Sequence, residues 1–150
     1  MEWMLMPFRR YAEFSGRSRR MEFWMFTLLT FIVELICFAL MFAGGFNLMT
    51  MSDPTAVPEA PGVLFWLGAG LLAIYVLAAL IPSIAVTVRR LHDRDMSGWW
   101  YLGVIVASLI PILNIIAAIG FLVLMLLPGT AGPNRFGPDP KDPNSAEVFA

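Results

Sequence analysis

The sequence has very few of the side chains that build catalytic or metal centres. It contains one cysteine, Cys37, and one histidine, His92, among 150 residues. A lone cysteine forms no disulfide within the chain and builds no thiolate metal cluster. A single histidine beside Asp93 and Asp95 also falls short of the ligands that a zinc site needs. We therefore expect no metal, no cofactor and no internal disulfide.

Charged residues are also scarce for a chain of this length. They make up 14% of the sequence, against 59% apolar residues, and the formal net charge is −1. A soluble domain of this length covers a large surface with polar groups, and this composition does not supply them. The length has room for one domain. The composition therefore predicts a single domain embedded in a membrane.

Three long apolar runs predict the architecture. Each exceeds the roughly 20 residues with which a helix crosses a hydrocarbon core of about 30 Å. A helix satisfies its own backbone hydrogen bonds in lipid, which an open sheet does not. We predict an all-α integral membrane bundle with three transmembrane helices, forming one domain over residues 1–140 with a flexible tail over 141–150. An interfacial segment, residues 1–22, precedes the spans, which are Phe23–Phe46, Val63–Val88 and Trp99–Leu127.

The third run is longer than a simple span. At 1.5 Å per residue it would form a helix of about 44 Å, which demands tilt or a break. Pro111 lies near its middle and Asn114 follows, so we expect a kink there. A single tilted and kinked span is the preferred interpretation. The alternative is a re-entrant hairpin that turns at Pro111–Asn114, with arms too short to cross, and the side of the carboxyl terminus stays open between the two.

Arginines flank the apolar runs unequally. Five arginines precede the first run and three follow the second, whereas the connection Asn47–Gly62 holds Asp53 and Glu59 but no Lys or Arg. Short loops rich in Lys and Arg stay on the cytoplasmic side. We therefore predict a cytoplasmic amino terminus, a cytoplasmic second loop and an external first loop. The arginines are Arg9, Arg10, Arg17, Arg19, Arg20, Arg89, Arg90 and Arg94.

Three motifs outside the apolar runs occur in a characteristic order. They are FSGRSRRMEFW at Phe14–Trp24, RRLHD at Arg89–Asp93 with SGWW at Ser97–Trp100, and PGT at Pro128–Thr130 with GPNRFGPDP at Gly132–Pro140. In this order they resemble the bacterial inner-membrane family catalogued as domain of unknown function 805. The resemblance covers roughly Tyr11 to Pro140, and the chain departs from it in a longer first loop around Asp53–Pro61. It implies a bacterial plasma-membrane location and brings no assigned reaction, substrate or cofactor.

Glu34 is the charged residue nearest the middle of a predicted span. A charged side chain there costs about 2.5–3.5 kcal/mol on insertion scales. Tyr75 and Asn114 fall at a similar depth in the other two runs, so we predict a candidate intramembrane polar cluster of Glu34, Tyr75 and Asn114. The cluster serves either as a proton, ion or substrate contact, or as packing in which a protonated carboxyl hydrogen bonds across helices.

A second candidate cluster lies at the predicted cytoplasmic face. His92 and Asp93 are adjacent on a helix and point about 100° apart, so they do not form an oriented catalytic pair. We expect one of the arginines at positions 17, 19 and 20 to approach Asp93 or Asp95, and other arginines to contact anionic lipid headgroups. The cluster comprises Arg17, Arg19, Arg20, Arg89, Arg90, His92, Asp93 and Asp95.

These features favour a non-enzymatic membrane protein that binds a partner or lipid. The alternative is an oligomeric small transporter or channel subunit that uses Glu34, because three helices enclose little space by themselves. A second copy of the chain or another membrane protein is a further partner that the sequence leaves open. The flanking positions of the arginines argue against nucleic acid.

Overall fold

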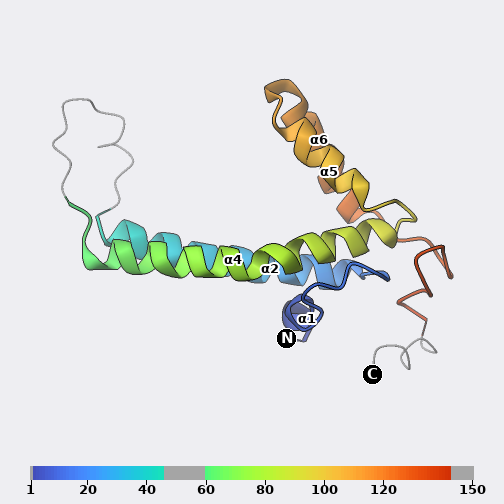
Figure 1. The fold of residues 1–150 in the computed structure, drawn as a ribbon, viewed down its shortest axis with the longest axis horizontal. Helices are drawn as coiled ribbons and strands as arrows, with labels where there is room; N and C mark the ends of the chain where they lie inside the picture. Colours follow the sequence, from blue (N-terminus) through green and yellow to red (C-terminus); the bar gives the residue numbers. More distant parts are fainter. Residues whose placement is uncertain (1, 46–59, 143–150) are drawn as a thin grey trace. The chain divides into compact units, whose positions relative to one another are not determined.

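The computed structural model describes residues 2–45 and 60–142. Over these residues the chain forms helices and no strand, apart from one isolated bridge between Asn134 and Gly137. The all-α prediction is confirmed. Most of the predicted first loop and the end of the tail lie outside the described residues. The helices are α1 (Glu2–Arg9), α2 (Arg20–Ala43), α4 (Val63–His92), α5 (Trp99–Ser108) and α6 (Pro111–Leu126) (Figure 1).

Among the described helices, α2 and α4 are long and apolar enough to cross a membrane. They have 24 and 30 residues. In the most apolar 18-residue stretch of each helix, only 11% and 28% of the stretch, respectively, is buried inside the protein. Their apolar side chains therefore face outward, unlike those of a core helix in a soluble protein. The structure thus contains two candidate spans where the sequence predicted three.

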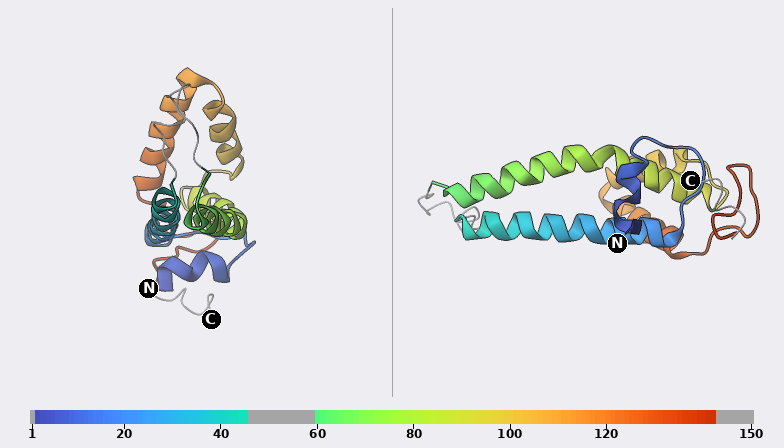
Figure 2. Two further views of the ribbon diagram at one scale, coloured as in Figure 1. Left: turned by 90° about the vertical axis from the view of Figure 1, so that its left-hand side faces the viewer. Right: turned by 90° about the horizontal axis from the view of Figure 1, so that it is seen from below.

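The described residues form two compact units. The first unit comprises Met1–Phe26 and Ile81–Ala150, and the second comprises Thr27–Leu80. In the second unit, α2 and α4 run antiparallel and side by side (Figures 1 and 2). Gly68 lets the two backbones approach, because a Cβ there would lie 2.7 Å from the Cys37 carbonyl oxygen. A hydrogen bond of 3.1 Å joins the Thr30 and Tyr75 hydroxyls nearby.

The third apolar run does not form one helix. Ile110 has an extended backbone, φ −101° and ψ 119°, which ends α5 before Pro111 begins α6. An extended conformation is the one that the residue before a proline prefers, and proline fits the first turn of a helix. The two helices pack against one another as a hairpin (Figure 2). The single kinked span is therefore not formed. The run is a helical hairpin, as in the alternative prediction, but its turn lies at Leu109 and Ile110 rather than at Pro111–Asn114, and its re-entrance into a membrane stays a prediction.

The core of the first unit lies where α1, the start of α2, the end of α4 and the base of the hairpin meet. Phe8 of α1 packs edge-on against Phe26 of α2, with ring centroids 5.4 Å apart. Phe121 of α6 contacts Phe23 in the same manner at 6.5 Å. Met125 is 1% exposed. These ring contacts join α1, α2 and α6 beside the charged residues of the unit.

Candidate functional site

Five charged side chains are buried at the centre of the first unit. We call Arg17, Glu22, Arg89, Arg90 and Asp93 the buried charge cluster; each is at most 3% exposed. Three cations and two carboxylates give the cluster an excess of one positive charge. A buried charge is tolerated only when it is paired and hydrogen bonded. The partners of each member therefore show what the cluster holds together.

Asp93 accepts hydrogen bonds from two arginines. Arg17 Nε donates to Asp93 Oδ1 at 3.0 Å, and Arg90 Nη1 donates to Oδ2. Arg17 lies before α2 and Asp93 lies after α4, so the ion pair ties the amino-terminal segment to the loop that follows α4. The sequence predicted that one of the arginines at positions 17, 19 and 20 would approach Asp93 or Asp95, and Arg17 does so at Asp93.

Arg89 forms the second buried ion pair. Its Nη2 donates to Glu22 Oε1 at 2.6 Å, and its Nη1 donates to the Glu13 carbonyl oxygen at 2.6 Å. The backbone carbonyl of Arg89 in turn accepts the N–H of Ser18 at 3.1 Å. Arg89 therefore contacts the segment between α1 and α2 with both its side chain and its backbone.

Backbone carbonyls after α6 accept further hydrogen bonds from Arg17 and Arg90, while the buried Nε atoms of Arg89 and Arg90 have no partner among the described residues. Arg17 donates to the carbonyls of Thr130 and Gly132, each at 2.6 Å. Arg90 donates to the Leu127 carbonyl, and the N–H of Thr130 donates to the Asp93 carbonyl at 2.8 Å. Gly129 packs directly on the Asp93 carboxylate. The segment after α6 is thus an integral part of the cluster.

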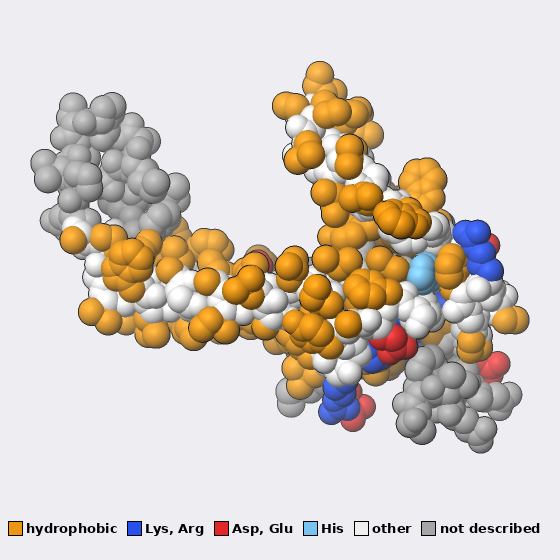
Figure 3. All heavy atoms as spheres, in the orientation of Figure 1, with side chains coloured by type: hydrophobic (Ala, Val, Ile, Leu, Met, Phe, Trp, Pro, Cys, Tyr) orange, Lys and Arg blue, Asp and Glu red, His pale blue; other side chains and the backbone are white. Residues whose placement is uncertain are grey.

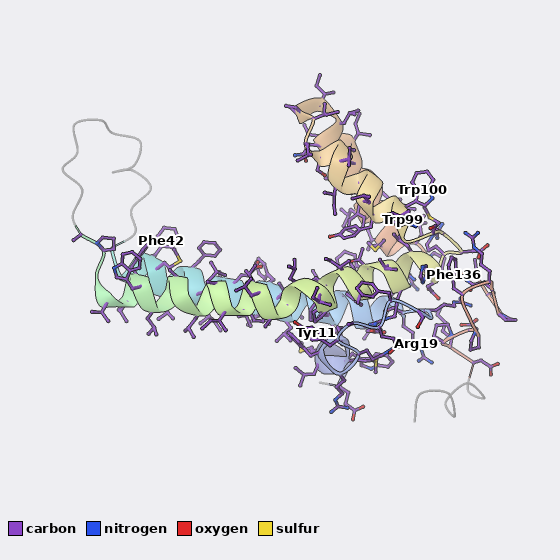
Figure 4. The ribbon with its side chains drawn as sticks, viewed as in Figure 1. Tyr11, Arg19, Phe42, Trp99, Trp100 and Phe136 are labelled. Atoms are coloured by element: carbon purple, nitrogen blue, oxygen red, sulfur yellow. The ribbon has the colours of Figure 1, made fainter. Side chains whose placement is uncertain are left out.

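His92 is occupied by structural contacts. Its ring stacks on Phe136 with centroids 3.9 Å apart and planes 5° from parallel, and its Nδ1 lies 3.2 Å from the Gly16 carbonyl oxygen (Phe136 is labelled in Figure 4). The carboxylate of Asp93 faces arginines instead. Within residues 2–45 and 60–142, no three His, Cys, Asp or Glu side chains are grouped to hold a metal ion.

The other predicted members of the face cluster do not join Asp93. Arg19 donates to the Pro140 carbonyl and stacks over the Trp3 ring at 5.5 Å. Arg20 donates to the Leu126 carbonyl at 3.1 Å. Asp95 pairs with Arg135 at 3.1 Å on the surface, where both side chains are about half exposed or more. The structure therefore brings together the buried members and leaves these residues around them.

A pocket of about 570 Å³ lies beside the cluster, between α1, the segment that leads from α1 into α2, and the tail at Pro138 and Pro140. Its walls include four arginines, two glutamates and the ring of Trp3. Arg10 is bound to Glu13 at 2.7 Å, and this hydrogen bond holds the pKa of the Glu13 carboxyl below its usual value. Arg17 is engaged by the cluster. The charged wall residues are Arg9, Arg10, Arg17, Arg19, Glu13 and Glu22.

The candidate intramembrane cluster is divided between the two units. Glu34 and Tyr75 belong to the second unit and Asn114 to the first, so the three-residue cluster stays a prediction. Glu34 is half-buried on α2. Within the part of the chain that the structure describes, no hydrogen-bond partner of its carboxyl group is found. The Tyr75 hydroxyl lies 3.1 Å from the Thr30 hydroxyl.

Two sets of participants were missed by sequence reasoning. Glu22 is one, because an acidic residue in the first turn of a helix is common and does not by itself indicate a buried partner. The carbonyls of the segment after α6 are the other. The PGT and GPNRFGPDP motifs marked this segment, but nothing in them identifies backbone oxygens as arginine acceptors.

The family described as "Protein of unknown function (DUF805)" matches residues 11–138. The chain belongs to this family. This DUF805 protein is 36% identical to inner membrane protein YhaI of Escherichia coli K12 over 94% of its own length and 97% of the relative's. It is 35% identical to inner membrane protein YhaH of the same strain, over 94% and 98% of the two chains. No solved structure matches.

The family and the helices together establish an integral membrane protein. The matched region includes every residue of the buried charge cluster, and both relatives are inner membrane proteins. The two long helices of the DUF805 protein expose the apolar surface that a bilayer covers. The side on which its amino terminus lies stays a prediction.

Proposed function

We propose that the protein is a non-enzymatic membrane protein that binds anionic phospholipid headgroups in the pocket beside α1. The observation that carries the proposal is the pocket wall, which has four arginines against two glutamates. Arginine is suited to phosphate because its planar guanidinium donates two parallel hydrogen bonds. The pocket volume of about 570 Å³ lies in the range of small-ligand sites.

Two arginines are the ones available to a ligand. Arg10 and Arg17 are held by carboxylates, whereas Arg9 is exposed and Arg19 has only its Nε bound to a backbone carbonyl. Trp3 lies under the Arg19 guanidinium. Tryptophan favours the headgroup level of a bilayer, where an apolar ring and a polar N–H are both accommodated. Arg9, Arg19 and Trp3 thus combine phosphate recognition with a position at the lipid surface.

The proposal of a non-enzymatic role rests on the buried charge cluster and the neighbouring His92. The cluster's carboxylates are paired with arginines, and the His92 ring is stacked. This leaves no histidine–carboxylate couple there for acid–base work. Because the arginines are concentrated before α2 and after α4, and such segments favour the cytoplasmic side, we place the pocket at the cytoplasmic leaflet.

The test is lipid binding by the purified full chain in detergent. Titration calorimetry with dioctanoyl phosphatidylglycerol and dioctanoyl phosphatidylcholine compares anionic and zwitterionic headgroups. We expect preference for the anionic lipid and roughly 10-fold or greater weakening in Arg9→Gln and Arg19→Gln, because a charge-assisted hydrogen bond contributes about 1.5–3 kcal/mol. Arg135→Gln, outside the pocket, is the matched control. Equal binding of both lipids, or unchanged binding by both pocket variants, would overturn the proposal.

A second candidate is an oligomeric transporter or channel subunit. Glu34 favours it, as a half-buried carboxyl on a membrane helix without a partner among the described residues. An unsatisfied polar group at that depth marks a functional position by default. Ion flux into vesicles that depends on protein and is abolished by Glu34→Gln, with folding retained, would support this reading. Flux equal in variant and wild type would exclude Glu34 from it.

A further inference from the structure

The α5–α6 hairpin has an apolar surface that the protein itself leaves uncovered. At its turn, Leu109 is 78% exposed and Ile112 is 77% exposed. Large apolar side chains cover the face visible in Figure 3. Exposed apolar patches of this extent mark contact with a membrane or another protein. Further exposed residues of the hairpin are Leu102, Ile105, Val106, Ile110, Leu113, Ile115, Ile116 and Ile119.

Both ends of the hairpin are fixed at the same place. The residue pair Asp93–Thr130 connects the segment before α5 to the segment after α6 through a backbone hydrogen bond of 2.8 Å. Arg94 before α5 also donates to the Pro128 carbonyl after α6 at 2.7 Å. The chain therefore enters and leaves the hairpin on one side, so the third apolar run does not cross a bilayer.

The arms have the length of one leaflet. At 1.5 Å per residue, the ten residues of α5 extend about 15 Å. Half of a hydrocarbon core is also about 15 Å thick. The sixteen residues of α6 extend about 24 Å, and the buried Met125 near its end belongs to the core of the first unit. The part of the hairpin that is free of the protein therefore fits a single leaflet.

The exposed aromatic residues of the hairpin lie at its base. Trp99 and Trp100, labelled in Figure 4, stand where α5 begins and are 78% and 61% exposed. Such tryptophans favour the boundary between headgroups and acyl chains. At the turn, the N–H groups of Leu109 and Ile110 donate to carbonyls of α5, and Pro111 has no N–H. These two N–H groups therefore do not require water.

We propose that the α5–α6 hairpin inserts into one leaflet of the bilayer, from the side that carries the arginines, with its turn among the acyl chains. We infer that hydrocarbon, rather than a protein partner, covers the exposed apolar surface of the hairpin. Exposed apolar residues occur along both helices, and the exposed aromatic residues lie only at the base. This inference is independent of the headgroup pocket, since no pocket residue belongs to the hairpin.

The test measures immersion depth by spin labelling in vesicles of phosphatidylcholine and phosphatidylglycerol. Single cysteines are introduced at Leu102, Leu109 and Ile112 in a Cys37→Ser background, with Leu77 of α4 as the bilayer-embedded reference and Lys141 as the aqueous one. Accessibility to oxygen is compared with accessibility to an aqueous nickel chelate. We expect the oxygen-to-nickel ratio to rise several-fold from Leu102 to Leu109 and Ile112, approaching the ratio at Leu77.

Two results would overturn the proposal. A ratio at both turn positions near that of Lys141 would mean that the hairpin lies in water or is covered by a protein partner. A ratio equal to that of Leu102 would mean that it lies flat at the headgroups. Two turn positions are used so that one disruptive substitution does not decide the outcome. Lipid titration of the same variants separates this result from headgroup binding.

Discussion

Gly129 packs so closely on Asp93 that a methyl group at Gly129 would overlap the Asp93 carboxylate. The residues are 36 positions apart in the sequence, and Asp93 is buried with both of its arginine partners. The carboxylate therefore has no free space to move into. Position 129 therefore requires a glycine, because the Asp93 carboxylate occupies the space that a Cβ would take.

We expect Gly129→Ala to lower the free energy of unfolding by roughly 1–3 kcal/mol or more, the usual cost of overpacking. SDS titration of the protein in mixed micelles, followed by circular dichroism, measures it. Gly103→Ala is the matched control, because its Cβ meets nothing within 4 Å and alanine favours a helix. Equal stability of the two variants would show that the carboxylate is not confined.

Asp93→Asn is expected to be among the most damaging substitutions in the first unit. It removes the partner of two buried arginines, and breaking a buried ion pair costs about 3–5 kcal/mol. Asp95→Asn is the control, because the exposed pair with Arg135 is worth about 1 kcal/mol or less. The same unfolding titration compares them, and a similar loss in both would contradict the assignment of Asp93 to the centre.

Gly68→Ala should loosen the pairing of α2 and α4. The added Cβ would lie 2.7 Å from the Cys37 carbonyl oxygen and 2.9 Å from Met41 Cγ, so the helices must separate. We expect a loss of roughly 1–3 kcal/mol in unfolding free energy. Gly70→Ala, two residues away in open space, should be neutral or stabilising. If Gly68→Ala behaves like Gly70→Ala, the close approach of the helices is disproved.

The ion pair of Glu13 with Arg10 predicts a pH dependence at the acidic end. The hydrogen bond from Arg10 lowers the pKa of the folded Glu13 carboxyl below its ordinary value of 4.5. The stabilisation is therefore fully present above pH 4.5 and is lost as pH falls through the folded pKa. Thermal melting from pH 3 to 7 should show Glu13→Gln below wild type at neutral pH, with the difference vanishing in acid. A constant difference would contradict this.

Sequence reasoning succeeded where the signal is carried by side-chain type. The apolar runs predict α2 and α4 because uninterrupted hydrophobicity of that length has few other solutions. Opposite charge predicts that an arginine before α2 approaches an aspartate after α4, without selecting Arg17 and Asp93. The choice between a kink and a turn at Pro111 depends on the backbone conformation of Ile110. The same residues are compatible with both conformations, so the sequence does not decide between them. The carbonyls that accept hydrogen bonds from Arg17 and Arg90 were beyond prediction, because every residue has a carbonyl and only the fold selects acceptors.

The dependence of the buried arginines on carbonyls after α6 imposes an order on biogenesis. Arg89 and Arg90 leave the ribosome at the end of α4, whereas the acceptors of Arg17 and Arg90 at residues 127–132 are synthesised some forty residues later. Until then, Arg17 and Arg90 lack the carbonyl acceptors that they have in the folded protein. The first unit therefore closes only after the hairpin has been made, and a ribosome stalled before Leu127 would hold a nascent chain in which these two arginines still lack those acceptors.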